Sequence, residues 1–362
     1  MSVAPPPEGA QLPPGGTARS AKGAPLDAAK GPVCVADHAN VAYVVRGVVA
    51  GLREAGIPVT VVTRPDEEPP PDTQVLMTCS AYLCPRERMA RLPDLRGVAA
   101  LASGTDNIDV PAATALGLLV AHAPTSENVT SMAEATVLLI LAALYRLDIS
   151  CQQLQQGWKP VPHEPVARTL ARRTVGLVGF GRIAAAVAHR LANWDVRMLA
   201  STQRADPSEL PSHVQRVPLE VLFEESDVVS LHGRLDAASD KLVGEALLSR
   251  MKTDAVLVNT ARGGLVDEEA LLRGVRAGRP AAVALDCYRQ EPLPAMSRLR
   301  SMPNAILTPH GVGHTRDVQD SLVRQGVRNA LDIAAGRVPE FVRNPEVLAR
   351  WALADSGAAA QG

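Results

Sequence analysis

The sequence predicts an α/β protein built from two doubly wound parallel sheets, and three observations support this prediction. The chain has 362 residues, enough for two domains of ordinary size. Short apolar runs alternate with helical patterns along most of it, which is typical of β-α-β units. Although 46% of the residues are hydrophobic, only 3% are aromatic, so the core must consist mainly of Ala, Val and Leu, as in buried parallel strands covered by helices.

The first part of the chain contains five predicted strands followed by a long helix. The strands are residues 33–36, 59–62, 75–77, 98–101 and 118–120. We expect the helix to begin at Thr130 or Ser131, where Ser131 and Glu134 form a capping box, and to end near Leu154. Residues 157–165 are polar and contain prolines, and they predict a linker.

A second series of strands and helices follows this linker. Its six apolar runs are residues 175–178, 196–199, 228–231, 255–258, 282–285 and 305–307. Six strands at this spacing complete one doubly wound sheet of the kind that binds nucleotides. The two ends of the chain depart from this pattern. Residues 1–31 are rich in Pro, Gly and Ala, residues 355–362 are similar, and both segments predict disorder.

Charge and cysteine content exclude several classes of function. The chain has 37 basic and 38 acidic residues, so we expect no nucleic-acid partner, because phosphate binding needs a basic surface. The longest apolar run, residues 137–145, is too short to cross a membrane, and we expect no membrane partner. The five cysteines are scattered without a C-x-x-C pair, which argues against disulfides and a zinc site and favours a cytoplasmic location.

A glycine-rich turn after the first strand of the second series predicts a dinucleotide site. Residues 179–184, GFGRIA, have the form G-x-G-x-x-A and lie between an apolar strand and a helix. The first glycine allows a tight turn, and the second lets the backbone approach a pyrophosphate that the helix N-terminus attracts. We therefore expect dinucleotide contacts from Gly179, Phe180, Gly181, Arg182 and Ile183.

The residues after the next strand indicate which dinucleotide is bound. NAD sites place a carboxylate there to bind the ribose 2′-hydroxyl, but this chain has Thr202, followed by Arg204. A missing carboxylate and a nearby arginine suit a 2′-phosphate, so we favour NADP over NAD as the cofactor. The alternative is that Arg204 is solvated and that Asp206 binds the ribose.

Three later segments each place one charged or titratable residue just after an apolar strand, where open α/β sheets bind their ligands: Arg262, Glu291 and His310. An arginine can hold a carboxylate through two parallel hydrogen bonds, a histidine can deliver a proton, and a glutamate beside it stabilises the imidazolium. The set suits proton-coupled hydride transfer. We expect no metal site, because the glycines at 311 and 313 oppose a helix that would bring His310 and His314 together.

These segments resemble the D-isomer-specific 2-hydroxyacid dehydrogenase family over about residues 32–347, most strongly in residues 174–185, 226–232, 251–272 and 304–315. The resemblance implies that Arg262 binds the substrate, that His310 is the acid/base, that Glu291 is its partner and that Asp286 holds the nicotinamide carboxamide.

The resemblance assigns further residues to the substrate and to the cofactor. Ser103 and Gly104 match the loop whose N–H groups bind the substrate carboxylate, and Asn128 matches a polar residue that lines the cleft. The cofactor-binding residues that it implies in the second series are His232, Thr260 and Ala261. Gly233 and Arg234 depart from the family's usual pattern after the histidine, where a proline is common.

The family's fold is implied as well. We expect a Rossmann dinucleotide-binding domain, residues 146–317, inserted into a flavodoxin-like substrate domain formed by residues 32–145 and 318–347. The active site is expected in the cleft between the two domains. Members of the family usually dimerise through the cofactor domain, so we expect a homodimer.

The expected function is hydride transfer between NAD(P)H and the C2 carbonyl of a small-molecule 2-oxo acid, the reaction of a D-2-hydroxyacid dehydrogenase. One alternative is a corepressor-like binding protein that senses dinucleotide with little turnover. An oxidase of formate or phosphite is a second alternative. The sequence disfavours it, because Thr308 and Pro309 precede the histidine and Ser103 stands where a phosphite site would have a lysine.

Overall fold

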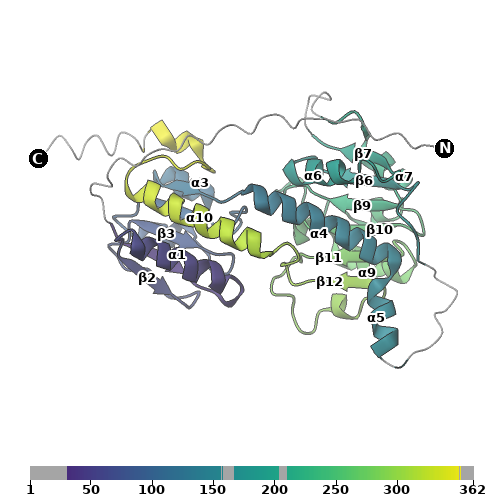
Figure 1. Cartoon of the computed structure of the whole chain (residues 1–362), viewed down its shortest axis with the longest axis horizontal. Coiled ribbons are helices and arrows are strands. Elements are labelled where there is room, and N and C mark those ends of the chain that lie inside the picture. The colour runs from purple at the N-terminus through teal and green to yellow at the C-terminus, as the bar shows by residue number, and fades with distance from the viewer. Residues whose placement is uncertain (1–30, 156, 158–166, 204–209, 350, 352–362) are drawn as a thin grey trace, which may run out of the picture.

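The computed structural model describes residues 31–155, 157, 167–203, 210–349 and 351, and it contains two parallel sheets that lie side by side (Figure 1). The two ends expected to be disordered lie outside these residues except for residue 31, and nearly all of the expected linker lies outside them as well.

The first sheet has the strand order β2-β1-β3-β4-β5, and all its pairings are parallel. This is the doubly wound order of flavodoxin-like domains. In β1, β3 and β4 all four residues are buried, since helices cover both faces of a parallel sheet. The five predicted strands are confirmed as β1 (Val33–Ala36), β2 (Val59–Val62), β3 (Val75–Thr78), β4 (Gly97–Ala100) and β5 (Leu119–Ala121).

The second sheet has the order β12-β11-β10-β9-β6-β7-β8, again with parallel pairings throughout. It is the dinucleotide-binding order 3-2-1-4-5-6 with one more strand at the β12 edge. Its strands are β6 (Thr174–Val178), β7 (Arg197–Ser201), β8 (Val214–Arg216), β9 (Val228–Leu231), β10 (Val256–Asn259), β11 (Ala282–Leu285) and β12 (Ala305–Leu307). Strand β8 was not predicted from the sequence. It is an edge strand in which only Val214 is buried, so it forms no apolar run.

Helices cover both sheets. They are α1 (Ala42–Glu54), α2 (Arg86–Ala90), α3 (Val110–Ala115), α4 (Ser126–Tyr145), α5 (Leu147–Gln155), α6 (Arg182–Leu191), α7 (Leu219–Glu225), α8 (Glu245–Leu248), α9 (Glu268–Arg276) and α10 (Arg316–Ala334). The short 3₁₀ turns are η1 (Ala39–Val41), η3 (Gly263–Leu265), η4 (Arg298–Ser301) and η5 (Pro345–Val347).

Helix α4 begins earlier than the sequence predicts. Its N-cap is Thr125, whose Oγ1 accepts a hydrogen bond from the N–H of Asn128 at 3.3 Å. The expected capping box at Ser131 is therefore wrong: Ser131 lies inside the helix, and its hydroxyl donates to the carbonyl of Gly313 at 2.8 Å. The single helix expected to reach Leu154 is wrong too, because Arg146 adopts a left-handed conformation and separates α4 from α5.

Helix α4 packs against the second sheet rather than the first. Its buried side chains Leu139, Ile140 and Leu144 share a core with Val175 of β6 and Val256 of β10. The expected domain boundary at residue 145 therefore does not coincide with the packing, which places the division before α4. Within the described residues, α4 is also the one helix long and apolar enough to cross a membrane, and half of that stretch is buried inside this fold.

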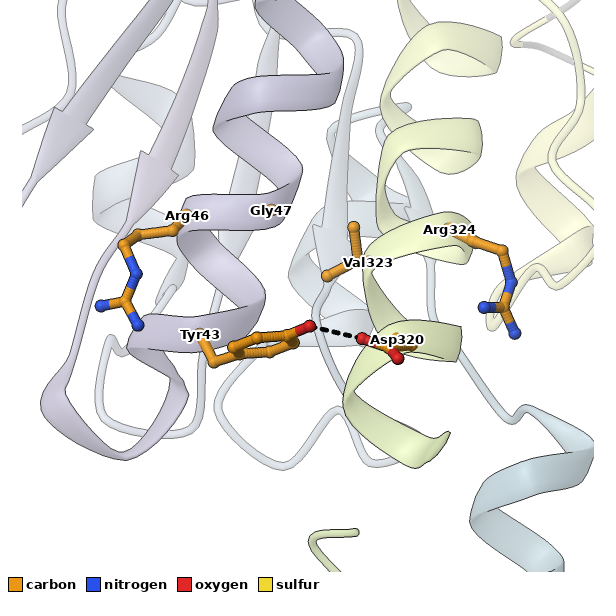
Figure 2. Close-up of a pocket in the computed structure, with 6 residues that line it drawn as sticks. All are labelled: Tyr43, Arg46, Gly47, Asp320, Val323 and Arg324. Atoms are coloured by element: carbon orange, nitrogen blue, oxygen red, sulfur yellow. Dashed lines mark hydrogen bonds between the residues drawn. The ribbon is translucent and has the colours of Figure 1, made fainter. Parts of the chain in front are cut away.

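Helix α10 returns from the second sheet to cover the first. Gly47 and Gly51 of α1 face Val323 and Val327 of α10 so closely that a Cβ on either glycine would meet a valine methyl group at less than 3 Å. The Tyr43 hydroxyl of α1 donates to Asp320 of α10 at 2.6 Å, and Figure 2 shows this bond across a hollow between the two helices. None of the sequence-predicted site residues lines that hollow.

Candidate active site

Arg262 lies just beyond the carboxyl end of β10 and reaches across to the first sheet. The buried side chain of Asn259 fixes its loop, because the amide nitrogen donates to the carbonyl of Arg262 and the amide oxygen accepts from the N–H of Ala261. The next residue must be glycine, since a Cβ at Gly263 would lie 1.9 Å from the backbone of Tyr288. The buried amide and the glycine together determine where the guanidinium lies.

The guanidinium of Arg262 is bound by Asp106, a residue that sequence reasoning did not assign to the site. Nε and Nη2 donate to one carboxylate oxygen of Asp106 at 3.1 and 2.9 Å. Desolvation raises the pKa of Asp106, but the hydrogen bond and the charge of Arg262 outweigh it, so the pKa is lowered. Gly104 makes room for this pair, because a Cβ there would lie 2.5 Å from Nη2 of Arg262.

Glu291 and His310 form a direct pair at the ends of β11 and β12. One carboxylate oxygen of Glu291 lies 2.6 Å from Nδ1 of His310, and the other accepts from the N–H of Tyr288 at 2.9 Å. The hydrogen bond to Glu291 raises the pKa of His310 against an opposing desolvation. Desolvation would raise the pKa of Glu291, yet the bonds from His310 and Tyr288 lower it. The pair therefore favours an imidazolium beside a carboxylate.

Asp286 holds the segment that carries His310. The residue is 2% exposed, and one carboxylate oxygen accepts from the Thr308 hydroxyl at 2.6 Å and from the N–H groups of Gly311 and Val312 at 3.0 and 3.2 Å. His310 itself has a positive φ of 49°, a conformation that few residues adopt without support from their surroundings. The contacts of Asp286 provide that support.

The predicted carboxylate-binding loop lies next to Arg262 and is held from behind by His122. The Ser103 hydroxyl lies 3.2 Å from both the Asn128 amide oxygen and the carbonyl of Ala123. Nδ1 of His122 lies 2.8 Å from the Ser103 carbonyl. Burial lowers the pKa of His122, so the neutral ring donates through Nδ1. The structure thus brings Ser103, Gly104 and Asn128 together beside Arg262.

The glycine-rich turn has the geometry that a dinucleotide requires. Gly179 has a positive φ of 84°, and a Cβ on it would lie 2.8 Å from the backbone nitrogen of Gly233. Gly181 is the N-cap of α6, and a Cβ there would meet no atom within 4 Å, so the N-terminus of the helix is open to a phosphate. Phe180, in contrast, is 4% exposed and belongs to the core.

Other predicted cofactor residues border the same turn. Arg182 donates to the carbonyl of Pro124, which joins the turn to the segment before α4. Thr260 is buried with its hydroxyl 3.1 Å from that of Thr136, and Ala261 follows it in the Arg262 loop. His232 pairs with the Ser230 hydroxyl at 3.0 Å, and burial lowers its pKa to about 4, so it is neutral at physiological pH.

The residues that select the dinucleotide are only partly described. Thr202 follows β7 directly, and its carbonyl accepts from Nη2 of Arg216 at 3.0 Å. Arg204 and Asp206 lie outside the described residues. Arg216 is a basic residue at this position that sequence reasoning missed, because it belongs to the unpredicted strand β8.

In the described part of the chain, no group of three His, Cys, Asp or Glu side chains could hold a metal ion.

Comparison with known proteins identifies the family that these features belong to. A model of the D-isomer specific 2-hydroxyacid dehydrogenase NAD-binding domain matches residues 137–311. A glyoxylate reductase of Thermofilum pendens is 36% identical over 267 residues, which cover 72% of this chain and 78% of the relative. The TT0316 protein of Thermus thermophilus has a similar structure, with a TM-score of 0.76 and 32% identity over 86% of this chain and 99% of that one.

An NAD complex of a formate dehydrogenase from Staphylococcus aureus is also similar, with a TM-score of 0.75 and 27% identity over 83% of this chain and 94% of that one. The two parallel sheets and the glycine-rich turn agree with a match to a family of NAD-binding enzymes. The chain therefore belongs to the D-isomer-specific 2-hydroxyacid dehydrogenase family and is an NAD(P)-dependent oxidoreductase that interconverts 2-oxo and 2-hydroxy acids.

Proposed function

We propose that Arg262, Glu291 and His310 carry out the reduction of a 2-oxo acid in this chain. The observation that supports this most strongly is the 2.6 Å contact of Glu291 with His310 at the strand ends next to Arg262. Since Nδ1 of His310 is engaged by Glu291, Nε2 is the nitrogen that gives a proton to the carbonyl oxygen of the substrate. A bound nicotinamide supplies the hydride that C2 receives.

Arg262 holds the carboxylate of the substrate. Asp106 and the carbonyl of Ala261 occupy part of its guanidinium, and the remaining N–H groups can bind an anion. The N–H groups of the Ser103–Gly104 segment provide further donors, and His122 and Asn128 fix that segment. Positioning of this kind supplies much of the rate in a reaction that has no covalent step.

The cofactor that we propose is NADP, in preference to NAD. Thr202 occupies the position of the usual carboxylate, and the guanidinium of Arg216 donates to its carbonyl, so this position carries a positive charge in place of a negative one. The similar formate dehydrogenase was solved with NAD, so both dinucleotides have to be tested.

For assembly we propose a homodimer formed through α4 and α5. Helix α5 has no buried residue, and Figure 1 shows it extending away from both sheets. Large apolar side chains are exposed along the two helices: Leu138 by 55%, Tyr145 by 50%, Leu147 by 53% and Leu154 by 66%. Several large apolar side chains exposed on two successive helices are typical of an interface, and a second copy of the chain would cover them. We also propose a cytoplasmic location, because the five cysteines are free thiols.

Oxidation of NADPH and of NADH by the purified protein tests the function. Each cofactor is combined with glyoxylate, hydroxypyruvate, pyruvate, phenylpyruvate and branched 2-oxo acids. We expect turnover that is faster with NADPH and that His310→Ala lowers by about 10² to 10⁴-fold. Turnover with NADH alone would contradict the NADP assignment. Tight dinucleotide binding without turnover of any acid would favour the corepressor-like alternative, and near-full activity of His310→Ala would refute the assigned role of His310.

A further inference from the structure

His310 lies on the segment that connects the two sheets. Residues 308–315, here called the crossing segment, run from β12 at the edge of the second sheet to α10, which covers the first. Asp286 accepts hydrogen bonds from the Thr308 hydroxyl and from two N–H groups just after His310. Because Asp286 directly follows β11, these bonds fix the crossing segment relative to the second sheet.

The far part of the crossing segment is held by α4. The Ser131 hydroxyl donates to the carbonyl of Gly313 at 2.8 Å, and Ser131 is only 6% exposed. The same carbonyl accepts from the N–H of Thr315, the N-cap of α10. Met132 packs against this turn so closely that a Cβ on Gly313 would lie less than 3 Å from its sulfur. A buried hydrogen bond and a close contact therefore fasten the turn after His310 to α4.

The same part of α4 contacts two other loops of the site. The Ser103 hydroxyl of the predicted carboxylate-binding loop donates to the amide oxygen of Asn128 at 3.2 Å. The Thr136 hydroxyl lies 3.1 Å from that of Thr260, in the loop that follows β10. Asn128, Met132 and Thr136 are each four positions apart, so they lie on one face of the helix. Helix α4 thus holds the crossing segment at a fixed place relative to the loops on either side.

We propose that Ser131 is a positioning residue for the reaction, whose bond to Gly313 keeps Nε2 of His310 directed at the carbonyl of a 2-oxo acid bound by Arg262. The proposal rests on the proposed function, because it concerns the proton transfer assigned to His310. Asp286 orients the crossing segment against the second sheet, and Ser131 orients it against the loop that binds the carboxylate. Proton transfer requires hydrogen-bond distance, and a displacement of about 1 Å costs roughly 10²-fold in rate.

Ser131→Ala tests the proposal by separating the rate of hydride transfer from substrate binding. Alanine is the best helix former, so the variant keeps α4 and loses only the hydroxyl. We expect hydride transfer to slow by about tenfold or more, and both KM values to change by less than about twofold, because Arg262 and the glycine-rich turn keep their contacts. Rapid mixing measures the single-turnover rate, and steady-state kinetics measures KM. Both use the acid and the dinucleotide that the wild type turns over fastest.

The pH dependence distinguishes a displaced histidine from a general loss of structure. The titratable groups that act on the charge of His310 are Glu291, Asp286, Arg262, Asp106 and His314. Ser131→Ala removes none of them, so a shift in the pKa of His310 reports a change in its distance from them. The bond to Glu291 raises this pKa, and a looser contact lowers it. We therefore expect kcat/KM for reduction to fall at lower pH in Ser131→Ala than in the wild type.

Ser321→Ala is the matched control. Ser321 is 3% exposed, and its hydroxyl donates to that of Thr125 at 2.9 Å, so this substitution also removes a buried bond between α10 and the start of α4. That bond does not involve the crossing segment. Both variants should lose stability to urea, while Ser321→Ala keeps the wild-type rate of hydride transfer and the wild-type pH profile.

Two outcomes would overturn the proposal. One is hydride transfer in Ser131→Ala that is as fast as in the wild type. The other is an equal slowing in Ser131→Ala and Ser321→Ala with no change in either pH profile, which would reduce Ser131 to a role in stability. Neither result affects the proposed function as long as His310→Ala is inactive. If His310→Ala is nearly as active as the wild type, the proposed function fails instead.

Discussion

At the scale of single residues, the site depends on two carboxylates that each hold a basic partner. Glu291 holds His310, and Asp106 holds Arg262, in both cases through bonds of 3.1 Å or less. The first pair connects segments after neighbouring strands of one sheet, and the second joins the two sheets. Each carboxylate has a pKa below its ordinary value, so both are charged when their partners are. Each pair therefore has its own measurable consequence.

Glu291→Gln should move the pH dependence of reduction to lower pH. The reaction needs protonated His310, so kcat/KM is highest at low pH and falls as the pH rises through the pKa of His310. The carboxylate of Glu291 raises that pKa, and removing its charge lowers it, so the fall occurs at lower pH. A pH profile of kcat/KM for 2-oxo acid reduction measures the shift. His189→Gln, at an exposed histidine of α6, should leave the profile unchanged.

Asp106→Asn should weaken substrate binding. The amide keeps the shape of the side chain but loses the charge that holds Arg262, so we expect the KM for the 2-oxo acid to rise about tenfold. Steady-state kinetics at saturating cofactor measures this change. Asp66→Asn, which removes an exposed ion pair with Arg64, should have no effect. An unchanged KM in Asp106→Asn would show that Arg262 does not depend on this carboxylate.

At the scale of elements, the proposed catalytic residues occupy the turns that follow three neighbouring parallel strands, β10, β11 and β12. Parallel strands bring their carboxyl ends to one edge, so residues far apart in sequence meet there. Helix α4 supports this edge from the other side, since Ser131 bonds to Gly313 just after His310 and Thr136 bonds to Thr260. The start of α4 therefore matters for the site as well as for the helix.

Thr125→Ala should destabilise the protein through the start of α4. It removes the cap that accepts from Asn128 and the oxygen that accepts from the Ser321 hydroxyl of α10. We expect a loss of about 1–2 kcal/mol in the free energy of unfolding, measured by urea titration. Thr130→Ala, at an exposed position of the same helix, should change it by less than about 0.5 kcal/mol. Equal losses in both variants would contradict the assignment of the cap.

At the scale of the whole molecule, the two sheets are joined by α4, which runs along the second, and by the segment that leads into α10, which covers the first (Figure 1). The bonds from Arg262 to Asp106 and from Arg182 to Pro124 fasten one sheet to the loops of the other. Helix α5 takes no part in either core. Its apolar side chains serve the proposed contact with a second copy.

Leu147→Glu combined with Leu154→Glu should convert the proposed dimer into a monomer. Both leucines are more than half exposed on α5, and a charge at either position would be buried without a partner in the dimer. Light scattering after size exclusion measures the mass. Val338→Glu, at a valine 50% exposed beyond α10, is the control and should remain dimeric. A wild-type chain that is already monomeric at micromolar concentration would contradict the dimer.

The sequence by itself determined the two sheets, the glycine-rich turn and the identity of the three residues at the strand ends. These features are local: an apolar run of four residues predicts a buried strand, and the residue after it must lie at the sheet edge. Prediction from local apolar runs failed for segments that contain few apolar residues. Strand β8 has one buried residue and was not predicted. The first turn of α4 is polar, so its N-cap at Thr125 was not recognised.

Only the tertiary structure decided which charges meet. Asp106 and Arg262 are 156 positions apart, and nothing in either neighbourhood predicts their hydrogen bonds. The same holds for α4, whose apolar residues could have covered either sheet. Pattern specifies which face of an element is buried, but the partner of that face depends on contacts between distant segments, which form only in the folded chain.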